Sequence, residues 1–193
     1  MARDPSALPS NLPVPEDDGA ADHLVGMRVP ALQLPATVGG ERDLAELATG
    51  TLVLYIYPKT GVPGVPLPDG WDAIPGARGC TPQACGFRDH HAELTALGAT
   101  IAGLSAQTPA EQAEAAERLH LPFPLLADPA RHLGSALSLP TFDSGGTTLY
   151  RRLTLVARAG RIETTFYPVF PPDANAEEVV AWLSGPGRAI PIR

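Results

Sequence analysis

Both cysteines of this chain lie in one short segment that is predicted to begin a helix. Residues 79–89 read GCTPQACGFRD, which places Cys80 and Cys85 five positions apart. Thr81 is a favourable helix N-cap, and Pro82 suits the first helical position because its missing N–H would have no partner there. Cys80 is therefore expected at the positive end of a helix dipole, among unsatisfied backbone N–H groups. Such a setting lowers the pKa of a thiol and favours the reactive thiolate.

The spacing of the two cysteines limits how they can interact. Residues 83–97 can run as a helix, and on an intact helix a five-residue step separates two Cα atoms by roughly 8–9 Å. A disulfide usually needs a separation below about 7 Å, so the pair can bridge only if the first turns unwind. This favours a reactive thiol with a resolving partner. Two buried cysteines that only pack remain an alternative, and zinc is disfavoured because no second cysteine pair exists.

Composition narrows the class of protein. The 193 residues are 44% hydrophobic and 18% charged, as expected for one globular domain. The net charge of −7 disfavours nucleic acid or an anionic membrane as a partner. No apolar stretch is long enough to span a bilayer, and the proline-rich, acidic first twenty residues lack a signal core. We therefore expect a cytoplasmic protein whose two cysteines carry out redox chemistry.

The order of the predicted elements indicates an α/β protein. Residues 1–25 read as an extended arm, and residues 26–193 as a single domain. Residues 51–57 form a nearly continuous apolar run, which is typical of a central strand covered on both faces. The further elements expected are strands at 100–105 and 124–126, helices at 108–119, 129–137 and 175–184, and a β-hairpin of 149–157 with 161–167. This order predicts an α/β fold with a mixed sheet.

Several motifs together resemble one family. They are residues 57–59 (YPK), 79–89, Ser105, 121–129 (LPFPLLADP) and 152–156 (RLTLV). In this order they are similar to the atypical two-cysteine peroxiredoxins of the peroxiredoxin Q or bacterioferritin-comigratory type, over about residues 29–183. The resemblance implies a thioredoxin-like fold, with a mixed central β-sheet flanked by helices. It also implies that the end of the first long strand meets the start of the cysteine helix, where a peroxide would bind.

The resemblance also implies an activity and a set of site residues. Cys80 would attack a hydroperoxide, Cys85 would resolve the product as an intramolecular disulfide, and thioredoxin or a similar dithiol would reduce it. Arg152, two residues before Thr154, matches the family's arginine, and it would stabilise the charge on the leaving oxygen. Its neighbour Arg151 should face the other way by strand alternation; without the resemblance, either arginine reads equally well as a solvated strand residue. No metal, haem or flavin is implied, and the chain is expected to be a monomer or a weak dimer.

One departure from the family pattern is large. The family has a proline seven residues before the reactive cysteine and a threonine or serine three before it, but here these positions are Ala73 and Ala77. Pro58 would be the motif proline, displaced by an insertion of residues 62–78. The hydroxyl that orients the thiolate would then be Thr60, Thr81 or absent. The insertion itself reads either as a stiff flap beside the site or as a tolerated surface loop.

Two other functions remain open from the sequence. One is a thiol–disulfide oxidoreductase acting on protein disulfides, although such enzymes usually carry cysteines three residues apart. The other is a non-enzymatic redox sensor, whose disulfide would switch a binding surface on the insertion or the arm. The rate of peroxide consumption by the reduced protein separates the three functions.

Overall fold

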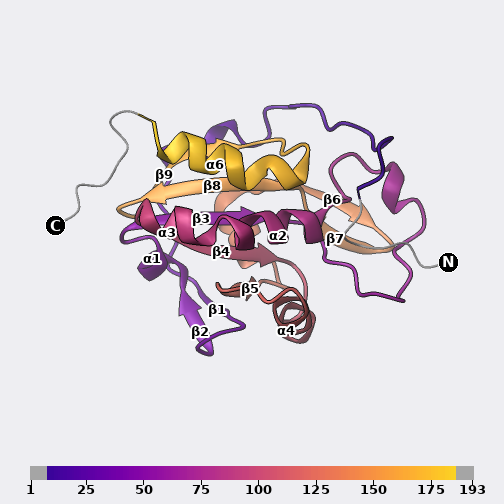
Figure 1. Ribbon diagram of the computed structural model, residues 1–193, viewed down its shortest axis with the longest axis horizontal. Helices are drawn as coiled ribbons and strands as arrows, with labels where there is room; N and C mark the ends of the chain where they lie inside the picture. The colour runs from indigo at the N-terminus through magenta and orange to yellow at the C-terminus, as the bar shows by residue number, and fades with distance from the viewer. Residues whose placement is uncertain (1–7, 186–193) are drawn as a thin grey trace.

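A five-stranded mixed sheet forms the centre of the computed structural model, which describes residues 8–185 (Figure 1). Its strands, in spatial order, are β5 (Leu125–Ala127), β4 (Ala99–Ser105), β3 (Thr51–Ile56), β8 (Leu153–Arg158) and β9 (Arg161–Phe166). The first three run parallel to one another, whereas β8 is antiparallel to β3 and β9 is antiparallel to β8. The predicted mixed sheet is therefore confirmed, with the predicted central strand at its middle.

The sequence of β3 explains its central position. All six residues of the strand are at most 1% exposed, because successive side chains enter two different hydrophobic clusters. Leu52, Leu54 and Ile56 face one cluster. Val53 and Tyr55 face the other, together with Cys80. A strand that is apolar on both faces can only lie between two covering layers.

The two faces of the sheet carry different elements. One face is covered by η1 (Asp22–Leu24), α1 (Leu44–Leu47) and α5 (His132–Leu137), together with the short strands β1 (Gln33–Pro35) and β2 (Glu41–Asp43). The other is covered by α2 (Cys80–Asp89), α3 (His91–Ala96), α4 (Pro109–Arg118) and α6 (Asn175–Leu183). In Figure 1, α2 and α6 lie close together across this second face, and they are in contact. The cysteine segment is thus held between β3 and α6.

Some predicted boundaries are confirmed. The Thr108 side chain accepts from the Glu111 backbone N–H and the Glu111 carboxylate accepts from that of Thr108, so the capping box that opens α4 is complete. The hairpin of β8 and β9 turns at Ala159 and Gly160, both with positive φ. The last helix begins at Asn175, as predicted.

Three predicted elements are wrong in their extent. The helix expected over 129–137 begins only at His132, because Arg131 has a φ of 56°. The helix expected over 83–97, with Thr81 as its cap, begins earlier, at Cys80 with Gly79 as N-cap, and breaks at His90 before α3. The strand expected over 149–157 is interrupted at Arg151 and Arg152. Its first part, β7 (Thr147–Tyr150), pairs instead with β6 (Thr141–Ser144) as a separate hairpin. The interruption falls where the chain leaves the two-stranded sheet of β6 and β7 and enters the central sheet, in which β8 pairs with β3.

The predicted insertion forms a separate small unit at one end of the sheet. It contains the one-turn helix η2 (Trp71–Ala73) and a small hydrophobic cluster centred on Trp71 and Ala77. Leu149 and Phe142, from the β6–β7 hairpin, complete this cluster. The hairpin therefore holds the base of the insertion. The division into arm, domain and insertion stays a prediction, although Ala21 and Leu24, near the end of the arm, are buried in the main core.

Candidate active site

Cys80 is the first residue of α2, and Gly79 determines how it is presented. Gly79 has a φ of 104°, in the left-handed region that favours glycine. A Cβ at this position would lie 2.2 Å from Cγ of Pro172, in the one-turn helix η3 (Pro172–Ala174). Only glycine therefore permits both this backbone turn and this close approach. The turn brings the Cys80 thiol to the N-terminus of a ten-residue helix, where backbone N–H groups are available.

The sulfur of Cys80 has two polar neighbours. Its thiol donates to the carbonyl of Ala77 over 3.7 Å, and Nη2 of Arg152 donates to Sγ over 3.2 Å. Cys80 is only 4% exposed and Arg152 only 3% exposed. In a site so poorly hydrated, the guanidinium stabilises negative charge on the sulfur far more than it would in water.

Arg152 is held in place by the backbone that precedes α2. Its Nε donates to the carbonyl of Gly76 over 3.2 Å, and its Nη2 donates to those of Ala77 over 3.2 Å and Arg78 over 3.0 Å. Three consecutive carbonyls thus fix the guanidinium against the last turn of the insertion. Ala77 occupies the position where the family has a hydroxyl, and here its carbonyl contacts both the thiol and the arginine.

A buried chain of side chains continues from Arg152 to α6. Nη1 of Arg152 donates to Oε1 of Gln83 over 2.5 Å, and Nε2 of Gln83 donates to Oδ1 of Asn175 over 3.0 Å. The Thr154 hydroxyl donates to the same Asn175 oxygen over 2.6 Å. Gln83, Thr154 and Asn175 are all fully buried. Sequence reasoning missed Gln83 and Asn175. Gln83 follows Cys80 by three residues, which places the two on the same face of a helix, and this spacing could have identified it. Nothing in the sequence marks Asn175.

The structure places the other predicted residues as follows. Pro58 is buried directly after β3, and Thr81 is buried beside Cys80. The Thr60 hydroxyl donates to Oε1 of Gln107 over 3.0 Å, and the Thr60 backbone N–H donates to the same atom over 2.8 Å. The Thr60 side chain is thus hydrogen-bonded to Gln107. Arg151 points away from the site, with a half-exposed side chain 3.9 Å from Asp18.

Cys85 lies on the same intact helix as Cys80, and both are free thiols. It is half-buried, at the edge of the cluster that contains Cys80. Arg88 lies one turn further on, where it donates to Asp89 over 2.8 Å and to the Leu119 carbonyl over 3.0 Å. The hydrogen bond to Asp89 raises the pKa of Arg88, and the nearby Cys85 adds to the effect. Arg88 is thus a neighbour of Cys85 rather than of Cys80.

Two tyrosines form the floor beneath α2. Tyr55 stacks on Phe87 with ring centroids 4.6 Å apart and on Tyr57 at 5.4 Å. Burial raises the pKa of both tyrosines well above the ordinary value, so both phenols stay neutral beside the thiol. The Tyr57 hydroxyl donates to Gln112 on α4. The floor is therefore apolar and uncharged, which leaves Arg152 as the charged group in contact with the sulfur.

A narrow crevice leads from the surface to Cys80. Its volume is about 20 Å³. It is lined by Lys59, Gly61, Leu67, Trp71, Arg78, Gly79, Cys80 and Thr81. The wall on one side comes from the insertion and on the other from the loop after β3. Within residues 8–185, no group of three His, Cys, Asp or Glu side chains could hold a metal ion, and no helix there is long and apolar enough to cross a membrane.

Comparison with known proteins identifies the family of the chain. Residues 24–180 match the Redoxin family model. A chloroplastic peroxiredoxin Q of Gentiana triflora is 27% identical over 180 residues, which are 91% of this chain and 76% of that protein. Peroxiredoxin bcp1 of Schizosaccharomyces pombe is 31% identical over 150 residues, which are 76% of this chain and 68% of that protein.

Solved structures agree as well. The crystal structure of peroxidoxin BcpB from Mycobacterium tuberculosis superimposes with a TM-score of 0.66 and 26% sequence identity, over 82% of this chain and 95% of that one. A thiol at the start of a helix, a buried arginine on its sulfur and a second cysteine on the same helix thus lie within a fold that these relatives share. The chain belongs to the Redoxin family and, within it, to the peroxiredoxins of the Q/Bcp type.

Proposed function

We propose that this protein is a thiol peroxidase that reduces hydrogen peroxide and organic hydroperoxides, with Cys80 as the attacking cysteine. The observation that carries the proposal is the 3.2 Å contact from buried Arg152 to the Cys80 sulfur at the start of α2. A permanently charged donor at this distance stabilises a thiolate, and it would also donate to the oxygen that leaves. The peroxide group would enter through the crevice above Cys80.

The first step forms a sulfenic acid. The Cys80 thiolate attacks the terminal oxygen of the hydroperoxide, the O–O bond breaks, and the electron pair leaves with the second oxygen. That oxygen takes up one proton and departs as an alcohol, or as water when the substrate is hydrogen peroxide. Sulfur is oxidised to Cys80–SOH while the peroxide is reduced. Negative charge grows on the leaving oxygen, so a donor fixed before the reaction lowers the barrier.

Arg152 and the Ala77 carbonyl would take the orienting role in this step. The Ala77 carbonyl accepts from the thiol, and the same carbonyl accepts from Arg152. Loss of the thiol proton replaces the first of these contacts by attraction between the sulfur and the guanidinium. Thr60, whose hydroxyl donates to Gln107, is a weaker candidate for this role in the reduced protein.

The second step would form the disulfide. The Cys85 thiol attacks the sulfur of Cys80–SOH, an S–S bond forms, and the hydroxyl group leaves as water after taking up the thiol's proton. Thioredoxin or a similar dithiol would then attack the disulfide, restore both thiols and become oxidised itself. Because the bridge forms within one chain, a monomer suffices for the cycle. A cytoplasmic location would supply the reducing environment that the resting thiols need.

The proposal is tested by thiol titration of the reduced protein before and after one equivalent of hydrogen peroxide. We expect both thiols to disappear within seconds, with mass spectrometry showing an internal Cys80–Cys85 bridge. Cys80→Ser should not consume peroxide, whereas Cys85→Ser should react once and stop at the sulfenic acid. If Cys80→Ser stays active and Cys85→Ser is inert, the two roles are reversed.

The rate decides between the proposal and its alternatives. A peroxidase consumes peroxide orders of magnitude faster than a free thiol in solution does, because its site stabilises the transition state. A disulfide exchanger or a slow redox sensor would lose its thiols at the rate of free cysteine. Stopped-flow measurement with glutathione as the reference thiol provides this comparison.

A further inference from the structure

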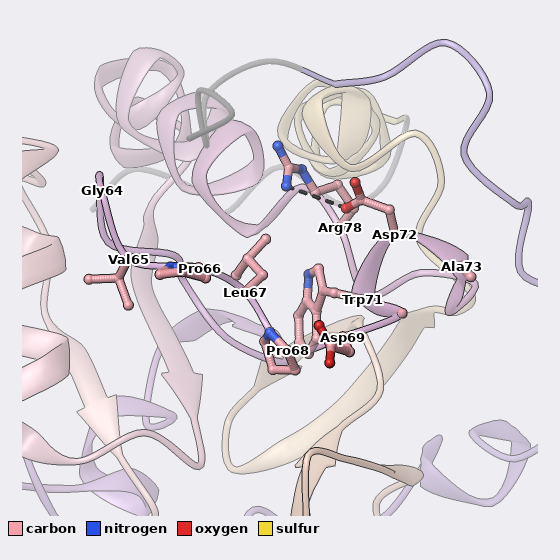
Figure 2. Close-up of a pocket in the computed structure, with 11 residues that line it drawn as sticks. Gly64, Val65, Pro66, Leu67, Pro68, Asp69, Trp71, Asp72, Ala73 and Arg78 are labelled. Atoms are coloured by element: carbon pink, nitrogen blue, oxygen red, sulfur yellow. Dashed lines mark hydrogen bonds and ion pairs between the residues drawn. The ribbon is translucent and has the colours of Figure 1, made fainter. Parts of the chain in front are cut away.

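The insertion that interrupts the family motif borders an open surface cavity much larger than the crevice over Cys80. Its volume is about 800 Å³. It is lined by residues 64–73 and by Arg78 (Figure 2). A space of this size is typical of a site for a small organic molecule. Nothing in the two-cysteine chemistry requires such a cavity, because hydrogen peroxide needs only the crevice.

The cavity and the crevice share one wall. Leu67, Trp71 and Arg78 line both spaces. Figure 2 shows Leu67 and Trp71 next to each other beneath Arg78. The crevice, at about 20 Å³, has room for a group about the size of one water molecule. A substrate that reaches the sulfur can therefore insert only its peroxide group, and any organic part must lie outside the crevice.

The lining of the cavity is suited to an apolar and uncharged group. Val65, Pro66, Leu67, Pro68 and Trp71 supply apolar surface. The charged residues are Asp69, Asp72 and Arg78, and Arg78 is paired with Asp72 over 3.4 Å. Two carboxylates against one paired guanidinium disfavour an anionic ligand such as a fatty acid.

The β6–β7 hairpin supports the cavity through its contacts with Trp71. Trp71 is only 3% exposed, and it packs against Phe142 of the β6–β7 hairpin with ring centroids 6.1 Å apart. Leu149 from the same hairpin packs into this cluster. Prolines restrict the backbone of the rim, which lowers the entropy that the loop loses when a ligand binds. The binding surface is therefore largely formed before substrate arrives.

We propose that residues 64–73 form a specificity pocket for the organic group of neutral alkyl or aryl hydroperoxides. Leu67 and Trp71, which line both spaces, would contact the organic group in the cavity and the peroxide group in the crevice. This inference rests on the proposed peroxidase function, and it names the substrate class that the insertion selects. The pocket would make bulky apolar hydroperoxides better substrates relative to hydrogen peroxide.

The first test measures selectivity, as the ratio of kcat/KM for cumene hydroperoxide to that for hydrogen peroxide. Leu67→Ala should lower this ratio about tenfold, the range typical of deleting methylene contacts in an apolar pocket. Val65→Asp should lower it several-fold by placing a carboxylate in the apolar wall. Val65 is 59% exposed, so this variant should fold normally. Val38→Asp is the matched control, because Val38 is 56% exposed and lies outside the cavity.

The second test needs no catalysis. The product alcohol of cumene hydroperoxide, 2-phenylpropan-2-ol, is titrated into Cys80→Ser protein while the two tryptophan indole N–H resonances are followed by NMR. The Trp71 resonance should shift, and the Trp182 resonance on α6 should serve as the internal control. Val65→Asp should weaken the binding and Val38→Asp should not.

The outcomes separate this inference from the function on which it rests. Failure of the wild-type protein to react with hydrogen peroxide would overturn the proposed peroxidase function. The alcohol titration would then still test whether the pocket binds an organic group. Rapid reaction with hydrogen peroxide, together with an unmoved Trp71 resonance and equal selectivity in Val65→Asp and Val38→Asp, would overturn the pocket. If the ratio of kcat/KM to that for hydrogen peroxide is the same for an anionic fatty-acid hydroperoxide as for cumene hydroperoxide, the preference for neutral substrates is overturned.

Discussion

The two sides of Cys80 are built in opposite ways. Toward α6, a chain of hydrogen bonds runs through Arg152, Gln83 and Asn175, each of which is at most 3% exposed. Toward the insertion, the sulfur faces a crevice that shares Leu67, Trp71 and Arg78 with the lining of a wide cavity, and the cavity rim includes Val65, which is more than half exposed. One side is a buried network of hydrogen-bonded side chains, whereas the other is a loop that packs on a cluster of a few apolar residues.

This difference assigns a separate task to each side. Chemistry on sulfur needs a donor whose position does not change between turnovers, and a buried polar network that satisfies its members supplies this rigidity. Selection of a substrate needs surface that can change without disturbing the reacting groups, and loops supply it. Arg152 connects the two tasks, because three of its acceptors are backbone carbonyls at the end of the insertion.

The largest effect is expected from breaking the buried side at Arg152. Arg152→Met removes the donor to the sulfur and to the leaving oxygen, so the peroxide step should slow by about 10²- to 10³-fold. Stopped-flow oxidation of the reduced protein measures this step directly. Arg151→Met is the matched control: its neighbouring guanidinium lies outside the site, so the rate should change little.

Arg152→Lys refines this test. Lysine keeps the charge but lacks the planar fork that contacts Gln83 and the sulfur together, so its rate should fall between those of wild type and Arg152→Met. Circular dichroism checks that the variants fold, because Arg152→Met leaves buried carbonyls without their donor. A folded Arg152→Met protein with the wild-type rate would show that the contact with Cys80 has no role in catalysis.

The sequence predicts the buried side better than the loop side, for a physical reason. Apolar runs such as residues 51–57 have one stable environment, and the capping box at Thr108 has one geometry, so both appear as predicted. The resemblance placed Arg152 beside Cys80, and the structure brings the two together. The buried chain behind the arginine was not predicted, because Gln83 and Asn175 lie far apart in sequence and only tertiary packing joins them.

The failures of prediction all lie where tertiary contacts override local preference. Thr81 and Pro82 suit a helix start, yet α2 begins at Cys80 because Gly79 makes the turn against Pro172. The expected strand over 149–157 breaks at Arg151 and Arg152, because its first part pairs with β6 and its second part pairs with β3. The cavity in the insertion could not be foreseen, since it depends on how residues 64–73 fold back on Trp71 and on support from the β6–β7 hairpin.

An intermediate effect is expected from oxidation, which must disturb the buried side. Cys80 and Cys85 cannot bridge across intact α2, so the disulfide requires its first turns to unwind. Unwinding breaks the bond from the Gln83 N–H to the Gly79 carbonyl, and it draws the Gln83 side chain away from Arg152 and Asn175. At about 1 kcal/mol net for each of several hydrogen bonds, the oxidised protein should be less stable than the reduced protein by a few kcal/mol.

Amide hydrogen exchange measures where this stability is lost. Residues 80–88 should lose protection in the disulfide form, while β3 keeps its protection. Cys85→Ser treated with the same peroxide is the control, because it cannot form the bridge and should keep α2 protected. Formation of the bridge with α2 fully protected would contradict the unwinding mechanism. Urea denaturation of both forms checks the accompanying change in the free energy of unfolding.

The smallest effect is expected at the arm, which lines a small crevice together with Arg152. Pro15 lines a small crevice with Gly76, Arg152 and Tyr167, and the Tyr167 hydroxyl donates to Asp18 over 2.8 Å. That hydrogen bond is the main cause that lowers the pKa of Asp18. Burial, followed by the same hydrogen bond, raises the pKa of Tyr167 to about 12. The contribution of Asp18 to the stability of the folded protein is therefore present above the pKa that this carboxyl has in the unfolded protein. It is lost as pH falls through the lower pKa of the folded protein. The Tyr167 contribution is present below pH 10 and lost as pH rises toward about 12.

The attachment of the arm should consequently hold from about pH 4 to pH 10 and weaken outside this window. The side-chain carboxyl carbon of Asp18, followed by NMR titration, should show a midpoint below the ordinary value for aspartate. Tyr167→Phe should move this midpoint back toward the ordinary value. The rate of the peroxide step should change far less than in Arg152→Met, since the hydroxyl contacts the arm and not the sulfur. A midpoint that Tyr167→Phe leaves unmoved would mean that the hydrogen bond does not form in solution, and that other contacts of the arm, such as the one between Asp18 and Arg151, hold it to this side of the site.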